Sequence, residues 1–123
     1  MAKQQEKYSL GIDFGTNSVR AVIARCRDGV EISTGVCNFP NGGVLLDDHD
    51  PNLARQFAGD YLASMQVAVS DAVKMVSPVI YENIIGIGVD ATGSTPGPVD
   101  ESGTPLALLE KFKSNPNAML SVI

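Results

Sequence analysis

Residues 8–16 have the sequence Tyr-Ser-Leu-Gly-Ile-Asp-Phe-Gly-Thr, an apolar run that ends in a carboxylate and a glycine. The apolar part predicts a short buried strand over 8–13, and Gly15 then opens a tight turn. A second apolar run, over 18–27, predicts the return strand of a hairpin. Backbone N–H groups in such a turn can hold an anion, and a carboxylate can hold a divalent cation through water. We therefore expect a hairpin that grips phosphate, with Asp13 beside it.

Two alternatives to a phosphate hairpin have to be compared with the same residues. The Walker loop requires Gly-x-x-x-x-Gly-Lys-Ser/Thr before a helix, and this string does not occur in the chain. An ordinary hairpin with an aspartate in its turn stays open on these residues alone, because Gly and Asp are common in turns.

The composition predicts one folded domain and excludes several kinds of partner. The chain has 123 residues, of which 44% are hydrophobic and 19% charged, so it can bury a core. A net charge of −5 and the lack of a basic run exclude a nucleic-acid partner. No apolar stretch is long enough to cross a membrane, and the polar start is followed by no signal core. We expect a cytoplasmic protein with no membrane partner.

The two cysteines and the single histidine are not expected to carry chemistry. Pairing of the strands over 18–27 and 30–38 keeps Cys26 and Cys37 on the order of 20 Å apart, so both should be reduced. His49 is flanked by acidic residues and is expected to be a solvated loop residue.

The rest of the chain predicts a helix and two further strands. Strands over 8–13, 18–27 and 30–38, joined by tight turns, should be antiparallel. Asp50-Pro51 predicts a helix start, and apolar residues at spacings of three and four extend that helix to 76. Residues 84–89 predict a central strand that is apolar on both faces, and 118–123 predict another strand.

Asp13 and Asp90 each follow a predicted buried strand. If the helix is a crossover, the strand over 84–89 lies parallel to the first one, and both carboxylates share the rim where open α/β sheets bind ligands. Two rim carboxylates also suit a two-metal nuclease, which the acidic charge disfavours. The pair Gly86-x-Gly88 lies within its strand, whereas the dinucleotide fingerprint places its glycines after the strand.

Four segments, in this order and at this spacing, resemble the amino-terminal domain of the FGGY family of carbohydrate kinases. They are DFGTNSVRA (13–21), GIGVDATGSTP (86–96), GTPLAL (103–108) and NPNAM (115–119). The resemblance implies a ribonuclease H-like (actin-like ATPase) α/β domain. Three antiparallel strands and one parallel strand would form its mixed sheet. A crossover helix would connect the third strand to the parallel one. Residues 1–7 would be a polar tail, and 8–123 part of that domain.

The resemblance also implies a reaction and a phosphate site. ATP and a sugar would bind between two actin-like domains, and a sugar hydroxyl would attack the γ-phosphate. Asp13 would act on Mg²⁺ through water. The phosphate turn and its flank would consist of Gly15, Thr16, Asn17, Ser18 and Arg20. An ion pair on the sheet surface is the alternative for Arg20.

The sugar site is implied in the same way. The sugar would be a pentulose, with L-ribulose as the choice that the resemblance favours and 5-phosphate as the product. Asp90, Thr92, Gly93 and Ser94 align with the stretch that touches the sugar, and the missing side chain of Gly93 would leave room for it. The alternative for Asp90 is a cap or turn residue that orders the loop.

Kinases of this family have several hundred residues, and their general base, second phosphate loop and adenine pocket would lie beyond residue 123. We therefore expect a truncated kinase, inactive alone, that lacks its C-terminal part. We expect it to self-associate through 118–123 or an uncovered sheet face. The alternative is a stand-alone actin-like module that binds a nucleotide or a partner without catalysis.

Overall fold

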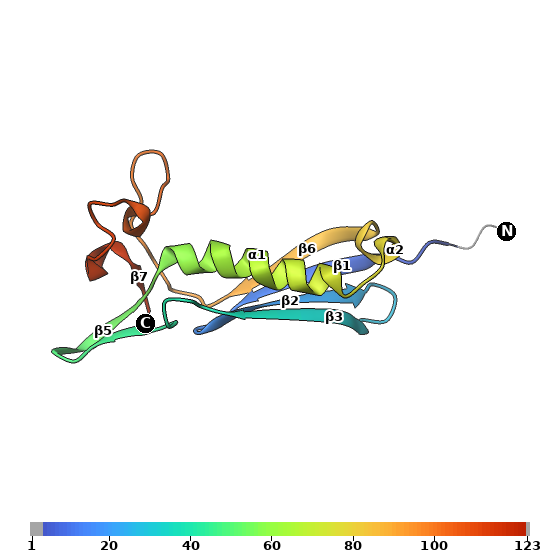
Figure 1. The fold of residues 1–123 in the computed structure, drawn as a ribbon, viewed down its shortest axis with the longest axis horizontal. Coiled ribbons are helices and arrows are strands. Elements are labelled where there is room, and N and C mark those ends of the chain that lie inside the picture. The colour runs from blue at the N-terminus through green and yellow to red at the C-terminus, as the bar shows by residue number, and fades with distance from the viewer. Residues whose placement is uncertain (1–3, 123) are drawn as a thin grey trace.

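A four-stranded mixed sheet carries one long helix on one face (Figure 1). The computed structural model describes residues 4–122. The strand order is β3-β2-β1-β6, with bounds β1 (Tyr8–Phe14), β2 (Ser18–Arg25), β3 (Glu31–Asn38) and β6 (Ile84–Ala91). The pairs β1–β2 and β2–β3 are antiparallel, and β6 runs parallel to β1. The predicted antiparallel unit, crossover and parallel strand are confirmed.

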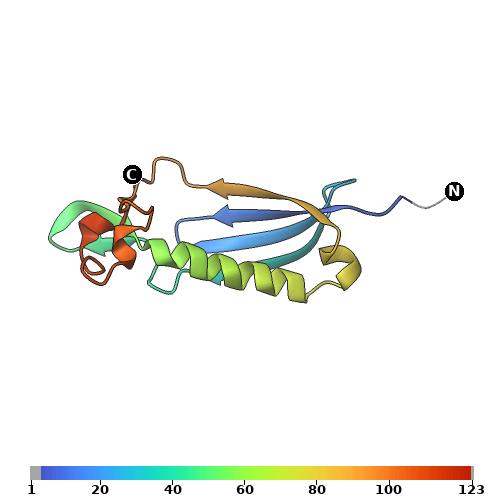
Figure 2. The ribbon, with the colours of Figure 1, turned by 90° about the horizontal axis from the view of Figure 1, so that it is seen from above.

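The core lies between the sheet and helix α1 (Ala58–Lys74). Alternate residues of β1 and β2 point to this side, because successive side chains of a strand face opposite ways. The buried apolar set is Tyr8, Leu10, Ile12, Val19, Ala21, Ile23, Phe39, Ala68 and Ala72. A short helix α2 (Pro78–Tyr81) then leads the chain into β6. Figure 2 shows α1 running along the β2–β3 side of the sheet, with β6 on the far side.

Helix α1 approaches β3 so closely that its backbone meets the strand. A Cβ on Gly35 would collide with the Ala68 carbonyl oxygen and would stand 2.9 Å from the Ala72 amide nitrogen. The Ser33 hydroxyl donates a hydrogen bond to the Ala72 carbonyl at 2.7 Å. Small residues on both elements therefore set the distance between helix and sheet.

The predicted helix start at Asp50-Pro51 is wrong. Residues 50–56 form β5 (Asp50–Gln56), which pairs with β4 (Leu45–Asp47) and with β7 (Leu120–Ser121). The Asp50 carboxylate accepts from the Asn52 amide at 2.9 Å at the start of this strand, so it caps no helix. The helix begins after Phe57, because pairing with a distant strand outweighs a local capping signal.

The predicted central position of β6 is also wrong. In the part of the chain that the structure describes, β6 is an edge strand, paired with β1 alone. Its Ile85, Ile87 and Val89 side chains are 64–66% exposed. Burial does not account for the apolar sequence of β6 in this structure. Helix α1 packs on β2 and β3 and does not cover β6.

The three strands β4, β5 and β7 form a second small sheet beyond the N-terminal end of α1 (Figure 1). Turns and the 3₁₀ segments Leu106–Leu108 and Pro116–Ala118 connect it to β6. The strand predicted over 118–123 is reduced to Leu120–Ser121, and Ile123 lies outside the described residues. Cys26 and Cys37 are both free, as predicted. Among residues 4–122 no helix is both long and apolar enough to cross a membrane.

Candidate functional site

Asp13 and Asp90 lie next to each other at the ends of β1 and β6. They are register partners in the parallel pair, and paired strands are about 4.8 Å apart. Both residues are exposed. The predicted shared rim of the two carboxylates is therefore confirmed.

Arg20 extends this pair into a row of three charged residues. It is the register partner of Asp13 on the β2 side, so the row runs Arg20, Asp13, Asp90 across three strands. None of the four ion pairs found among residues 4–122 involves Arg20. The guanidinium is therefore not held by an ion pair on the described surface, which was the alternative to a ligand-binding role.

The row lies in a hollow of about 400 Å³. Its lining is Gly11, Ile12, Asp13, Arg20, Val22, Gly88, Val89 and Asp90. Gly11 and Gly88 are register partners and place no side chains on the floor. Because Leu10 and Ile12 turn toward α1, the intervening Gly11 and Asp13 face the open side of the sheet. A bound molecule therefore has access to both carboxylates from solvent.

The turn between β1 and β2 is closed by one backbone hydrogen bond. The Gly15 amide donates to the Ser18 carbonyl at 2.8 Å, which leaves Thr16 and Asn17 at the tip. The Gly15 N–H is therefore used within the turn and cannot also bind an anion. Among the described residues, no group accepts a hydrogen bond from the Thr16 or Asn17 amide. Those two N–H groups are the donors that the turn can offer to a phosphate.

Three residues to which the sequence patterns gave no role at the site support this turn. The Gln56 side chain is 1% exposed and donates from Nε2 to the Thr16 carbonyl at 2.8 Å. The Tyr61 hydroxyl donates to Gln56 Oε1 at 2.8 Å. The Phe39 amide donates to the Asn17 carbonyl at 2.8 Å. Gln56 was hidden in the sequence because the predicted helix included it and gave it no role.

The loop after β6 holds the other predicted site residues, Thr92, Gly93 and Ser94. All three are exposed, and Ser94 has a φ of 56°, a left-handed conformation. The Thr95 hydroxyl lies 3.2 Å from the Thr92 hydroxyl and donates to the Gly93 carbonyl at 3.3 Å. A Cβ at Gly93 would meet no atom within 4 Å. The loop begins two residues after Asp90 and does not line the hollow around Asp13.

The carboxylate pair can accommodate one hydrated divalent cation. Among the described residues no cluster of three His, Cys, Asp or Glu side chains could enclose a metal. Mg²⁺ keeps several of its waters and is commonly bound by one or two carboxylates together with phosphate. Asp13 and Asp90 therefore fit Mg²⁺ better than a metal that needs a full protein cage.

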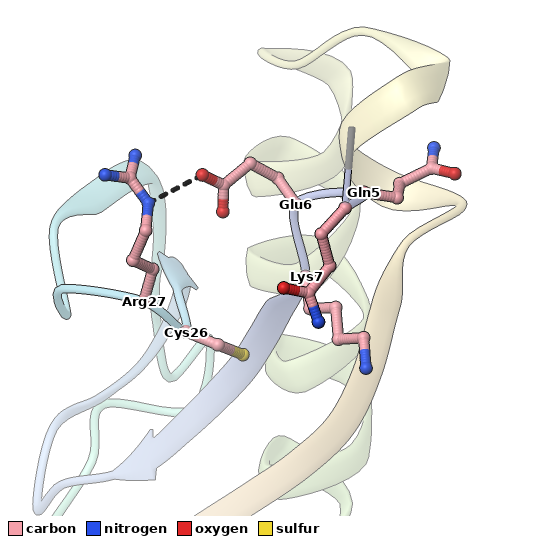
Figure 3. Close-up of a pocket in the computed structure, with 6 residues that line it drawn as sticks. Gln5, Glu6, Lys7, Cys26 and Arg27 are labelled. Atoms are coloured by element: carbon pink, nitrogen blue, oxygen red, sulfur yellow. Dashed lines mark hydrogen bonds and ion pairs between the residues drawn. The ribbon is translucent and has the colours of Figure 1, made fainter. Parts of the chain in front are cut away.

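A second hollow, of about 380 Å³, lies at the opposite end of the sheet (Figure 3). It lies where β1 starts and β2 ends, and an ion pair of 2.7 Å joins Arg27 Nε to Glu6 Oε1 beside it. Lys7 and Cys26 also line it. This hollow contains neither a carboxylate pair nor a glycine turn, so the Asp13 rim is the better candidate.

Hydrogen bonds lower the pKa of two carboxyl groups in turns away from the rim. The Arg25 guanidinium lowers the pKa of the Asp28 carboxyl in the β2–β3 connection. The Ser102 hydroxyl and the Thr104 amide lower the pKa of Asp100 in the loop before the Leu106–Leu108 segment. Both carboxylates stabilise turns, and neither is part of the candidate site.

Comparison with known proteins gives a consistent set of relatives. A ribulokinase of Vibrio parahaemolyticus is 40% identical over 116 residues, which is 93% of this chain and 20% of the relative. Ribulokinases of Geobacillus thermodenitrificans and Halalkalibacterium halodurans are 39% and 37% identical over 95% and 94% of this chain. The chain is similar to bacterial ribulokinases. No protein-family model matches it.

This similarity to ribulokinases confirms the resemblance to FGGY carbohydrate kinases that the four sequence segments predicted. The chain spans about a fifth of the length of the ribulokinases that it matches.

Proposed function

We propose that this chain forms one wall of the active site of an ATP-dependent sugar kinase. The observation that carries the proposal is the row of Arg20, Asp13 and Asp90 beside the Gly15–Ser18 turn. The similarity to ribulokinases supports a pentulose substrate, with L-ribulose converted to its 5-phosphate. The strand order β3-β2-β1-β6, with β6 parallel, supports an actin-like (ribonuclease H-like) fold. In this proposal residues 8–123 form part of that domain and residues 1–7 form its polar tail.

Phosphoryl transfer depends on positioning and on neutralising charge around the phosphates. In the proposed site, the Thr16 and Asn17 amides bind phosphate oxygens, while Gly15 and Ser18 fix the turn. Arg20 supplies positive charge beside Asp13. The Asp13 carboxylate would hold Mg²⁺ through water. The ion, when bound, offsets the negative charge of the phosphates.

The sugar would occupy the rim beside the phosphate turn. Asp90 can accept hydrogen bonds from sugar hydroxyls, and the Thr92 and Ser94 hydroxyls can donate or accept them. The open space at Gly93 gives the sugar ring or chain room next to these groups. Transfer also requires a general base and an adenine pocket, which would come from residues outside this chain.

An ADP-release assay with a panel of pentuloses tests this proposal. The complete gene product should release ADP with L-ribulose, and the 123-residue chain alone should not. General base action is typically worth 10²–10⁴-fold, and lost positioning adds to this. Nucleotide binding by the complete gene product without turnover on any sugar would instead support a binding module that lacks catalysis.

Substitution of Gly93 tests the sugar site at a single position. In the complete gene product, Gly93→Leu should raise the KM for the sugar about ten-fold or more and change kcat by less than about three-fold, because it fills binding space. Gly93→Ala is the matched control, since its Cβ meets open space and should leave KM nearly unchanged. Steady-state kinetics decide, and equal effects of Ala and Leu would place Gly93 outside the sugar site.

We further propose that the isolated chain self-associates through β6. Its Ile87 and Val89 side chains are 66% and 65% exposed, and its outer edge has no partner strand among residues 4–122. Residues 118–123 are less suited, because Ala118 is buried and Leu120 already pairs with β5. Open apolar edges and faces attract other chains.

Light scattering at micromolar concentration checks this expectation. The wild-type chain should be larger than a monomer, and Ile87→Lys should reduce it to a monomer. Leu62→Lys is the control, because Leu62 is similarly exposed, at 61%, but lies on α1. A monomeric wild-type chain would contradict the prediction.

A further inference from the structure

We propose that Gln56 is a positioning residue for the phosphate turn and directs the Asn17 N–H toward the ligand. The inference rests on the proposed function, since it takes the Gly15–Ser18 turn to be the part that meets phosphate. Gln56 would not touch ATP itself. It would act through the Thr16 carbonyl, to which it donates a hydrogen bond at 2.8 Å.

The orientation of the Gln56 carboxamide is fixed at both ends. The Tyr61 hydroxyl donates to Oε1 at 2.8 Å, so the NH₂ group has to face Thr16. Tyr61 itself is stacked against Phe14 and Phe39, with ring centroids 5.2 Å away in each case. A buried amide with both ends satisfied is a rigid link, and removing one partner leaves a costly unpaired group.

This link determines where the turn points its donors. The Thr16 carbonyl and the Asn17 N–H belong to the same planar trans peptide unit, so they point in opposite directions. Because Gln56 holds the carbonyl from the buried side, the Asn17 N–H has to point away from the core. No described group accepts from that N–H, so it is available to a phosphate oxygen.

The other side of the same turn is held independently. The Asn17 carbonyl accepts from the Phe39 amide, and Gly43 packs directly on Asn17, where a Cβ would collide with its side chain. The loop that contains Phe39 and Gly43 is held to α1 by the Asp60 carboxylate. This carboxylate is 2% exposed and accepts a hydrogen bond from Asn41 Nδ2 at 2.6 Å. The Asn17 residue is thus fixed from both sides, and Gln56 controls the peptide unit that precedes it.

Two variants of the complete gene product test this role. Gln56→Met keeps the length of the side chain and removes the donor, while Tyr61→Phe keeps the aromatic stack and removes only the hydroxyl that orients Gln56. The KM for MgATP should rise about ten-fold in Gln56→Met, where the hydrogen bond to the Thr16 carbonyl is lost, and about three-fold in Tyr61→Phe, where it is only less well oriented. The KM for the sugar should change by less than about two-fold in both.

Ser64→Ala is the matched control. Ser64 is also polar and buried, at 1% exposed, lies on α1, and its hydroxyl has no hydrogen-bond partner among the described residues. Its replacement should leave both KM values unchanged. A rise in the sugar KM equal to that for MgATP would show general destabilisation and overturn the positioning role.

Hydrogen exchange of the nucleotide-free protein gives a readout that does not depend on catalysis. The Gly15 and Phe39 amides, which donate to the Ser18 and Asn17 carbonyls of the turn, should exchange several-fold faster in Gln56→Met and Tyr61→Phe than in wild type or Ser64→Ala. An unchanged exchange rate in both variants would overturn the inference. If the wild-type protein phosphorylates no sugar, the proposed function fails, while the exchange rates still decide whether Gln56 orders the turn. If Gln56→Met does not fold, Tyr61→Phe decides alone.

Discussion

Asp13→Asn should lower the kcat of the complete gene product about 10²–10³-fold while the KM for the sugar stays within about two-fold. The carboxylate lies between Arg20 and Asp90 in the row across the sheet, and Asp13 stands two residues before Gly15, where the phosphate turn begins. In the proposed site it acts on Mg²⁺ and on the charge that develops during phosphoryl transfer. Asparagine keeps the size of the side chain and removes that charge.

Steady-state kinetics with varied sugar and MgATP check this expectation. Asp71→Asn is the matched control, because Asp71 is an exposed carboxylate on α1, 3.9 Å from Lys74 in a surface ion pair. Its loss should leave kcat unchanged, as exposed ion pairs contribute little. A raised sugar KM with normal kcat in Asp13→Asn would assign this carboxylate to sugar binding and contradict the proposed role.

Gly35→Ala should destabilise the folded chain by about 2–4 kcal/mol. The new Cβ, fixed to the β3 backbone, would collide with the Ala68 carbonyl oxygen, and this backbone atom cannot move without shifting α1 from the sheet. The Ser33 hydrogen bond to the Ala72 carbonyl would be strained by the same shift. The effect arises from overpacking, since alanine itself is no less suited to a strand than glycine.

Urea unfolding of the 123-residue chain, followed by circular dichroism, measures the difference. Gly86→Ala is the control, because Gly86 is also a strand glycine but its Cβ would meet no atom within 4 Å. That substitution should change stability by less than about 1 kcal/mol. Equal midpoints for the two variants would mean that α1 does not pack on β3 as closely as the structure has it.

The sequence by itself determined the strands of the main sheet and the position of the two carboxylates. Apolar alternation over 8–13 and 18–27, with Gly15 between them, is local information that needs no partner to be recognised. The crossover made β6 parallel to β1, and this placed Asp90 beside Asp13 at one rim. Local signals of this kind are reliable where turn chemistry and periodicity agree.

Only the tertiary structure decided the start of α1, the edge position of β6 and the role of Gln56. Residues 50–56 carry a good helix-start signal, yet they form β5 because β4 and β7 offer backbone partners that lie elsewhere in the chain. The strand β6 is apolar enough for a central position, but burial depends on which elements α1 covers. Gln56 is linked to Thr16 by a contact across 40 positions, and no local pattern encodes a hydrogen bond between segments so far apart.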